Sequence, residues 1–137
     1  MEAMLSVAKK FNSLYKEENG ADMDQMRMHK MMYLAQRESL MYNKELLFDV
    51  EFEGWVYGPV LVGVRDEYTN GTMFQSASDD LTKESQDLVE SVYQRYNKLT
   101  SWQLSTLSHG ELSWKNSRDG LSASEHGAVH LKLADMR

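Results

Sequence analysis

Apolar side chains recur at helical spacing in the first twenty residues of the chain. Between positions 3 and 18 the apolar residues are Met4, Val7, Ala8, Phe11, Leu14 and Tyr15. This spacing lines one face of an α-helix and predicts that this face is buried. Asn19 and Gly20 follow, and glycine accepts the left-handed conformation in which helices commonly end. We therefore expect a helix over 3–18.

A second helix is predicted over 23–42. Asp22 and Gln25 have the spacing of a capping box at its start. Its inner stripe consists of Met28, Met31, Met32 and Ala35. Six of the ten methionines lie between 23 and 41. A methionine stripe serves a core or a groove for a partner, and helical spacing favours the core. His29 is expected on the surface or at the rim of this helix.

The period changes to alternation in the segment 46–57, which predicts a short strand. Its inward side chains are Val50, Phe52 and Val56. A single strand cannot satisfy its own backbone groups, so a second strand is required. The segment 72–76 is the expected partner, which makes a small two-stranded element.

Pro59 is the only proline of the chain. Proline lacks an amide hydrogen and has a fixed φ, so it suits the first turn of a helix. Gly58 before it permits a sharp turn. We therefore predict a strand-to-helix corner here, followed by a helix over 59–69 that ends at Asn70 and Gly71.

Three further helices are predicted in the second half of the chain. The first covers 83–98 and is capped by Thr82. The second is short, covers 102–109 and starts at Ser101. The third covers about 123–135, after a capping-box pair. The expected fold is mainly α: a single compact domain over 1–137, with about six helices and a small two-stranded β element.

Composition and charge narrow the class of protein. The chain has no cysteine and no apolar run of the ~20 residues that a membrane span needs, so we expect a cytoplasmic protein. Residues 43–80 hold eight acids and two bases, a net charge of −6 that equals that of the whole chain. This block favours a basic partner over nucleic acid, whose phosphates need a basic face. Ordinary solvation of a loop-rich surface is the alternative.

The sequence holds few candidates for chemistry. His109 and Glu111 are compatible with a general base and its carboxylate, but a histidine at a helix end is more often a cap. His126 and His130 are four apart, as two metal ligands on one helix face would be, but the residues between them lack the glutamate of a zinc protease motif. A third ligand would have to come from elsewhere, such as Asp135 or His109. We therefore expect no catalytic residues, no metal and no cofactor.

Three blocks of sequence resemble the Panacea domain of the SocA-like antitoxins and phage-associated proteins. They are MRMHKMMYLAQ (26–36), FDVEFEGWVYGPV (48–60) and SHGELSW (108–114). In the first block Lys30, Tyr33, Ala35 and Gln36 fit the family pattern. In the later blocks the fitting residues that we select as candidate interface or motif positions are Trp55, Tyr57, Gly58, Pro59, His109, Glu111 and Trp114. For Trp55 and Trp114, burial in the core is the alternative to an interface role.

The resemblance implies a helical domain that binds protein. It implies an antitoxin of a toxin–antitoxin system that neutralises its toxin by direct contact. The partner is expected to be a basic toxin encoded nearby, and a Clp-type protease is a second partner that the resemblance implies. The alternatives are a prophage-encoded regulator or adaptor without a toxin, and a metal-dependent enzyme that uses the histidines.

Overall fold

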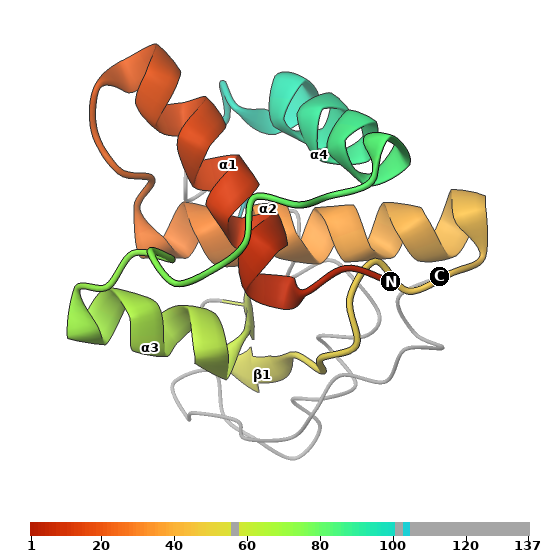
Figure 1. Cartoon of the computed structure of the whole chain (residues 1–137), viewed down its shortest axis with the longest axis horizontal. Coiled ribbons are helices and arrows are strands. Elements are labelled where there is room, and N and C mark those ends of the chain that lie inside the picture. The colour runs from red at the N-terminus through yellow and green to blue at the C-terminus, as the bar shows by residue number, and fades with distance from the viewer. Residues whose placement is uncertain (56–57, 101–102, 105–137) are drawn as a thin grey trace.

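The computed structural model describes residues 1–55, 58–100 and 103–104 (Figure 1). In chain order its elements are α1 (Met4–Asn19), α2 (Gln25–Glu38), the π-helical segment η1 (Ser39–Asn43), β1 (Glu53–Trp55), β2 (Gly58–Val60), α3 (Val62–Asn70) and α4 (Lys83–Tyr96). The mainly helical fold with a small two-stranded sheet is confirmed. The count of six helices is not, since the described residues hold four α-helices.

The remaining predicted helices fall largely outside the described residues. The helix over 123–135 lies outside them entirely. Of the helix over 102–109, only Gln103 and Leu104 are described, and both are helical. Thr100 makes the contacts of a cap at the start of this helix, and Ser101 lies outside the described residues. The Gln103 amide donates to the Thr100 hydroxyl at 3.1 Å, and the Gln103 side chain accepts from the Thr100 amide at 2.8 Å. The prediction of one domain over 1–137 stays a prediction.

Helix α2 is the centre of the described fold. It runs across the middle of Figure 1, with α1 crossing it, α4 above it and α3 and β1 below. It contacts α1, α3, α4 and β2. Ten of its 14 residues are buried. Because neighbouring elements cover α2 on nearly all sides, several of its polar residues are buried as well as the apolar ones. These polar residues must find hydrogen-bond partners inside the protein.

The methionine stripe belongs to the core, as the spacing predicts. Met28, Met31, Met32 and Ala35 are fully buried. Their cluster includes residues from the predicted inner faces of the two helices that cover α2: Val7, Ala8, Phe11, Val89, Val92 and Tyr93. The amphipathic patterns of α1 and α4 were therefore predicted correctly, because each of these helices buries one face only.

Local end signals were confirmed at three helix ends and wrong at one. Gly20 and Gly71 are left-handed, with φ of 75° and 71°, and end α1 and α3. The Thr82 hydroxyl accepts from the Ser85 amide at the start of α4. For α2 the cap is Asp24, which accepts from the Arg27 amide at 2.9 Å, and not Asp22.

The carboxylate of Asp22 has another role, which explains the wrong cap. It accepts from the side-chain amide of Asn12 at 3.0 Å. The Asn12 side-chain oxygen in turn accepts from the buried amide of Met23 at 2.8 Å. Asn12 thus holds the α1–α2 connection, and α2 starts two residues later than the capping-box pair predicted.

The predicted partner for the strand was wrong. β1 pairs with β2 in an antiparallel hairpin, with Glu53 opposite Val60, Gly54 opposite Pro59 and Trp55 opposite Gly58. The segment 72–76 forms a turn instead. Met73 and Phe74 in that turn have φ of 44° and 64°, which no extended strand allows. The buried Phe74 ring contacts Tyr68 edge-on at 5.9 Å.

Pro59 therefore does not start a helix. It lies in β2, and α3 begins three residues later at Val62. Antiparallel pairs alternate between those that exchange hydrogen bonds and those that do not, and a residue without an amide hydrogen fits only the second kind. The middle pair of the hairpin, Gly54 with Pro59, is that position. The corner between strand and helix falls at Leu61.

The predicted helix over 23–42 is also divided. Its α-helical part ends at Glu38, and the π-helical segment η1 follows. Glu38 is buried, and both of its carboxylate oxygens accept from the guanidinium of Arg95 on α4. This pair anchors the end of α2 to α4. No helix in the described ranges is long and apolar enough to cross a membrane.

Candidate protein interface

The segment before the hairpin is held on α2 by the side chain of Gln36. Gln36 is fully buried. Its amide nitrogen donates to the carbonyl of Phe48 at 2.7 Å, and its oxygen accepts from the amide of Leu47 at 2.8 Å. The chain at 47–48 thus pairs with a glutamine side chain, which supplies a donor and an acceptor as a strand would.

An aromatic cluster fills the space between α2 and the hairpin. The Tyr33 ring meets Phe52 edge-on, with centroids 5.6 Å apart. Phe48 and Phe52 are 6.0 Å apart in a tilted arrangement. All three rings are buried. Such pairs stabilise beyond their buried area by about 0.5–1.5 kcal/mol each, so they hold the chain just before β1 on α2.

His29 holds the other end of the hairpin. Its Nδ1 accepts from the amide of Leu61 at 3.2 Å, and its Nε2 lies 3.2 Å from the side-chain oxygen of Gln25. The proton therefore lies on Nε2 and is donated to Gln25. Burial, and then the neighbouring charge of Lys30, lower the pKa of His29 to about 3. The expectation of a surface or rim histidine was wrong.

Lys30 is also inside the protein. Its exposed fraction is 2 %, and burial lowers the pKa of its ammonium to about 8. A buried lysine at this value is still protonated at neutral pH. Helix α2 thus buries a positive charge at Lys30 and a neutral imidazole at His29, next to each other in sequence.

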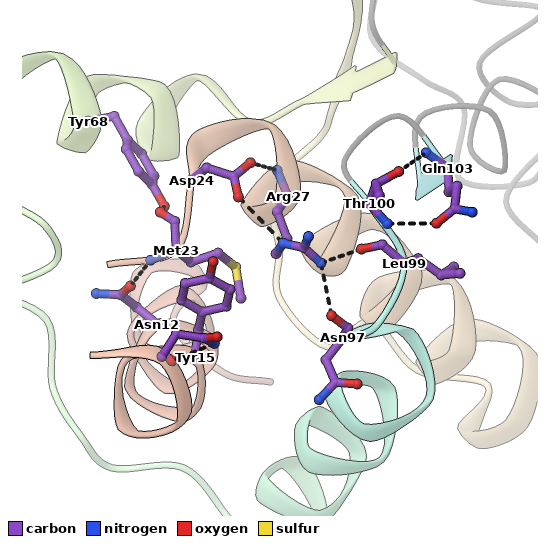
Figure 2. Close-up of polar contacts among 11 residues, drawn as sticks. Asn12, Tyr15, Met23, Asp24, Arg27, Tyr68, Asn97, Leu99, Thr100 and Gln103 are labelled. Carbon is purple, nitrogen blue, oxygen red and sulfur yellow. Dashed lines mark hydrogen bonds and ion pairs between the residues drawn. The ribbon is translucent and has the colours of Figure 1, made fainter. Parts of the chain in front are cut away.

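Arg27 joins the start of α2 to the chain that leaves α4 (Figure 2). One guanidinium nitrogen donates to the carbonyls of Asn97 at 3.2 Å and Leu99 at 2.7 Å. The Nε atom lies 3.4 Å from the carboxylate of Asp24, which makes an ion pair without hydrogen-bond geometry. The guanidinium also lies over the ring of Tyr15, 5.8 Å from its centroid. The arginine thereby fixes the direction in which the chain enters the Thr100–Gln103 cap.

Sequence analysis did not identify Arg27 as important. Its partners are about 70 residues away along the chain, at Asn97 and Leu99. No local pattern connects positions so far apart. The only hint of a special role was the position of Arg27 in the first turn of α2, where the helix dipole disfavours positive charge. The structure explains that placement, because the guanidinium binds carbonyl oxygens of another element.

Replacing Arg27 by lysine is expected to lower the free energy of unfolding by about 1–2 kcal/mol. Lysine keeps the charge, but its single ammonium cannot bind the carbonyls of Asn97 and Leu99 and also lie beside Asp24 and over the ring of Tyr15, as the larger guanidinium does. Urea denaturation followed by circular dichroism measures the change. Lys98→Arg, at an exposed position nearby, is the control and should cost less than about 0.5 kcal/mol. Equal, negligible costs for both variants would contradict the assigned role of Arg27.

The structure brings together only part of the candidate interface. Trp55, Gly58 and Pro59 lie in one hairpin, and Pro59 is buried. Tyr57, His109, Glu111 and Trp114 lie outside the described residues, as do His126 and His130. Among the residues described, no group of three or more histidines, aspartates or glutamates is arranged to hold a metal ion.

Comparison with known families identifies the chain. The family model described as antitoxin SocA-like, Panacea domain, matches residues 28–115. The chain belongs to this family. None of the curated proteins and none of the solved structures compared with it matches the chain.

The match clarifies what the shared blocks do. In this member of the Panacea family, Tyr33 and Gln36 of the first block support the hairpin that carries the second block. The two blocks are therefore parts of one unit of the fold. Helix α1 precedes the matched residues, yet its Val7 and Phe11 are fully buried in the common core. The folded unit extends beyond the matched segment at its N-terminal side.

Proposed function

We propose that the protein is an antitoxin-like binding module that neutralises a partner toxin by direct protein–protein contact. The match to the SocA-like antitoxin family over residues 28–115 carries this proposal. The partner is a toxin encoded by a neighbouring gene. The contact masks the active surface of the toxin, and no covalent bond forms or breaks.

The exposed acids of the described surface support a basic partner. Asp49 and Glu51, just before the hairpin, are exposed, and so are Asp66 on α3 and Asp79 and Asp80 before α4. Surfaces of one charge speed the encounter with partners of the opposite charge and disfavour nucleic acid. The aromatic contacts that hold the chain before the hairpin on α2 support binding by a preformed surface, which costs less ordering entropy than a mobile one.

The antitoxin activity has a direct test. The neighbouring gene should stop growth when it is expressed alone, and co-expression of this protein should restore growth. The two products should co-purify. A copy of this gene with an early stop codon is the control and should give no protection. Absence of toxicity together with absence of co-purification would contradict the proposal.

A stoichiometry measurement separates masking from catalysis. Purified toxin is titrated with this protein, and residual toxin activity is followed. Masking predicts that activity falls in proportion to the protein added and ends at a fixed molar ratio. Complete inactivation by a small fraction of an equivalent would instead indicate an enzyme, which turns over.

Delivery of the bound toxin to a Clp-type protease is an extension of the same proposal. In that case binding alone leaves part of the toxin active, and removal of the protease in the host abolishes the remaining protection. If protection is equal with and without the protease, masking is sufficient.

A further inference from the structure

A pocket of about 150 Å³ opens where η1, the segment after it and the first turns of α4 meet. A cavity near this volume accepts a group about as large as benzene, so it suits one side chain and not a peptide segment. Its apolar lining residues are Met1, Leu46, Leu47 and Leu88, and most of the lining is polar. Three carboxylates also line it, those of Glu2, Glu45 and Glu84.

The carboxylate of Glu2 is fixed in place. It accepts from the amide of Thr82 at 2.9 Å and from the Thr82 hydroxyl at 3.0 Å. Burial by itself raises the pKa of Glu2, but hydrogen bonds from Ser85 and Thr82 outweigh it, so the pKa is lowered. Glu2 is therefore a constant negative charge at the wall of the pocket.

The other two carboxylates have no such partners. Glu45 and Glu84 are exposed, and neither side chain pairs with a described residue. The nearest bases in sequence do not neutralise them: Lys83 pairs with Asp87 at 3.3 Å, and Lys44 does not line the pocket. The α-ammonium of Met1 also lines the pocket and contributes to lowering the pKa of Glu2, so it offsets part of the negative charge. The unpaired negative charge of the pocket is therefore that of Glu45 and Glu84.

The π-helical turn of η1 shapes this site. The Ser39 hydroxyl donates to the carbonyl of Glu45 at 2.8 Å, and Lys44 between them is left-handed with φ of 60°. This turn brings Ser39 and Glu45 to the pocket and leaves Tyr42 outside, 73 % exposed. Single π turns occur preferentially at functional sites, and exposed tyrosines are frequent anchors of protein interfaces.

We propose that this pocket receives one arginine side chain of a protein partner, with Tyr42 packing beside it. The aliphatic stem lies on the leucines, and the guanidinium binds the carboxylates of Glu45 and Glu84. Given the proposed function, the partner is the toxin. The proposal therefore names the part of the antitoxin surface that the toxin contacts.

Two features favour a long basic side chain over other occupants. Leucines beside carboxylates match a side chain whose stem is apolar and whose end is positive. Arginine suits it better than lysine, because the guanidinium is less strongly hydrated and directs five N–H donors toward carboxylates. An acidic or phosphate group would meet the unpaired carboxylates of Glu45 and Glu84.

A charge-neutral double variant tests the contact with the toxin. In Glu45→Gln/Glu84→Gln the shape stays and two charges are lost. The dissociation constant for the toxin should rise roughly tenfold or more, and the difference should shrink at high salt. Glu17→Gln/Asp87→Asn removes two charges from exposed positions that do not line the pocket, and should change affinity less than about threefold.

A small probe tests the pocket without the toxin. Acetyl-Gly-Arg-Gly-amide is titrated into the full chain and followed by amide chemical shifts. Saturating shifts at Glu45, Leu47 and Leu88 are expected in the wild type, and none in the double variant. The same peptide with citrulline, which has the shape of arginine without its charge, should leave these amides unchanged.

The two arms separate this proposal from the proposed function. If the toxin binds the wild type and the double variant equally, the pocket is not the contact, although the antitoxin function stands. If no toxin binds at all, the antitoxin function fails, and the peptide titration still decides whether the pocket takes arginine. Equal shifts with arginine and citrulline, or no shifts, would overturn the assignment of the pocket.

Discussion

Replacing Gln36 by leucine is expected to lower the free energy of unfolding by about 3 kcal/mol. Leucine has a similar volume but leaves the Leu47 amide and the Phe48 carbonyl buried without their partner. Each unpaired buried group costs about 1–3 kcal/mol, and the gain from burying leucine offsets part of the sum. Urea denaturation measures the loss.

The matched control is the same substitution at Gln94, which is exposed on α4. It should change stability by less than about 0.5 kcal/mol. Hydrogen exchange adds a local readout, since the amides of Leu47 and Phe48 should lose more protection in Gln36→Leu than amides of α1. If the two leucine variants have the same stability, Gln36 does not hold the segment before the hairpin on α2.

Lowering the pH from 7 to 5 is expected to cost about 2 kcal/mol of stability through His29 alone. The pKa of His29 is about 3 in the folded protein against 6.5 for a free histidine. Below pH 6.5 His29 binds a proton in the unfolded chain but not in the folded protein. The contribution of His29 to stability is therefore fully present above pH 6.5 and is lost as the pH falls toward 3.

His29→Asn isolates this effect. Its side-chain oxygen can accept from the Leu61 amide in place of Nδ1, and it does not titrate. The variant should be less stable at pH 7 because it is smaller, but its stability should fall less between pH 7 and 5 than that of the wild type. His109, His126 and His130 contribute equally to both proteins and cancel in the difference. Parallel pH profiles would show that His29 is not buried as a neutral imidazole.

Both predicted losses of stability depend on buried polar residues of α2. The hydrophobic pattern of the sequence placed His29 wrongly and did not explain Gln36. The periodicity of α2 identifies Met28, Met31 and Met32 as one buried face, and that is correct. It treats His29 as outward-facing, because an amphipathic helix has a polar face. The helix is instead covered on nearly all sides, and how much of a helix is covered depends on its neighbours.

In the candidate interface, too, some features were predicted from the sequence and others depended on neighbouring elements. The sequence blocks identified the hairpin residues Trp55, Gly58 and Pro59 as one motif, and they do lie in one element. The role of proline was wrong, because the choice between a first helical turn and a hairpin position depends on which strand pairs with β1. The pocket lined by Ser39, Glu45 and Glu84 was missed. It is built from the N-terminal residues, η1 and α4, which no single stretch of sequence contains.

The sequence by itself determined the features that depend on neighbours within a few residues: the amphipathic faces of α1 and α4, the glycine ends, the Thr82 cap and the family blocks. Only the tertiary structure decided the hairpin pairing, the burial of His29 and Gln36, the reach of Arg27 and the acidic pocket. The physical reason is range. Helical periodicity and capping are satisfied within one or two turns of chain. Partners for buried polar groups come from elements 11 to 72 residues away, and their positions follow only from packing.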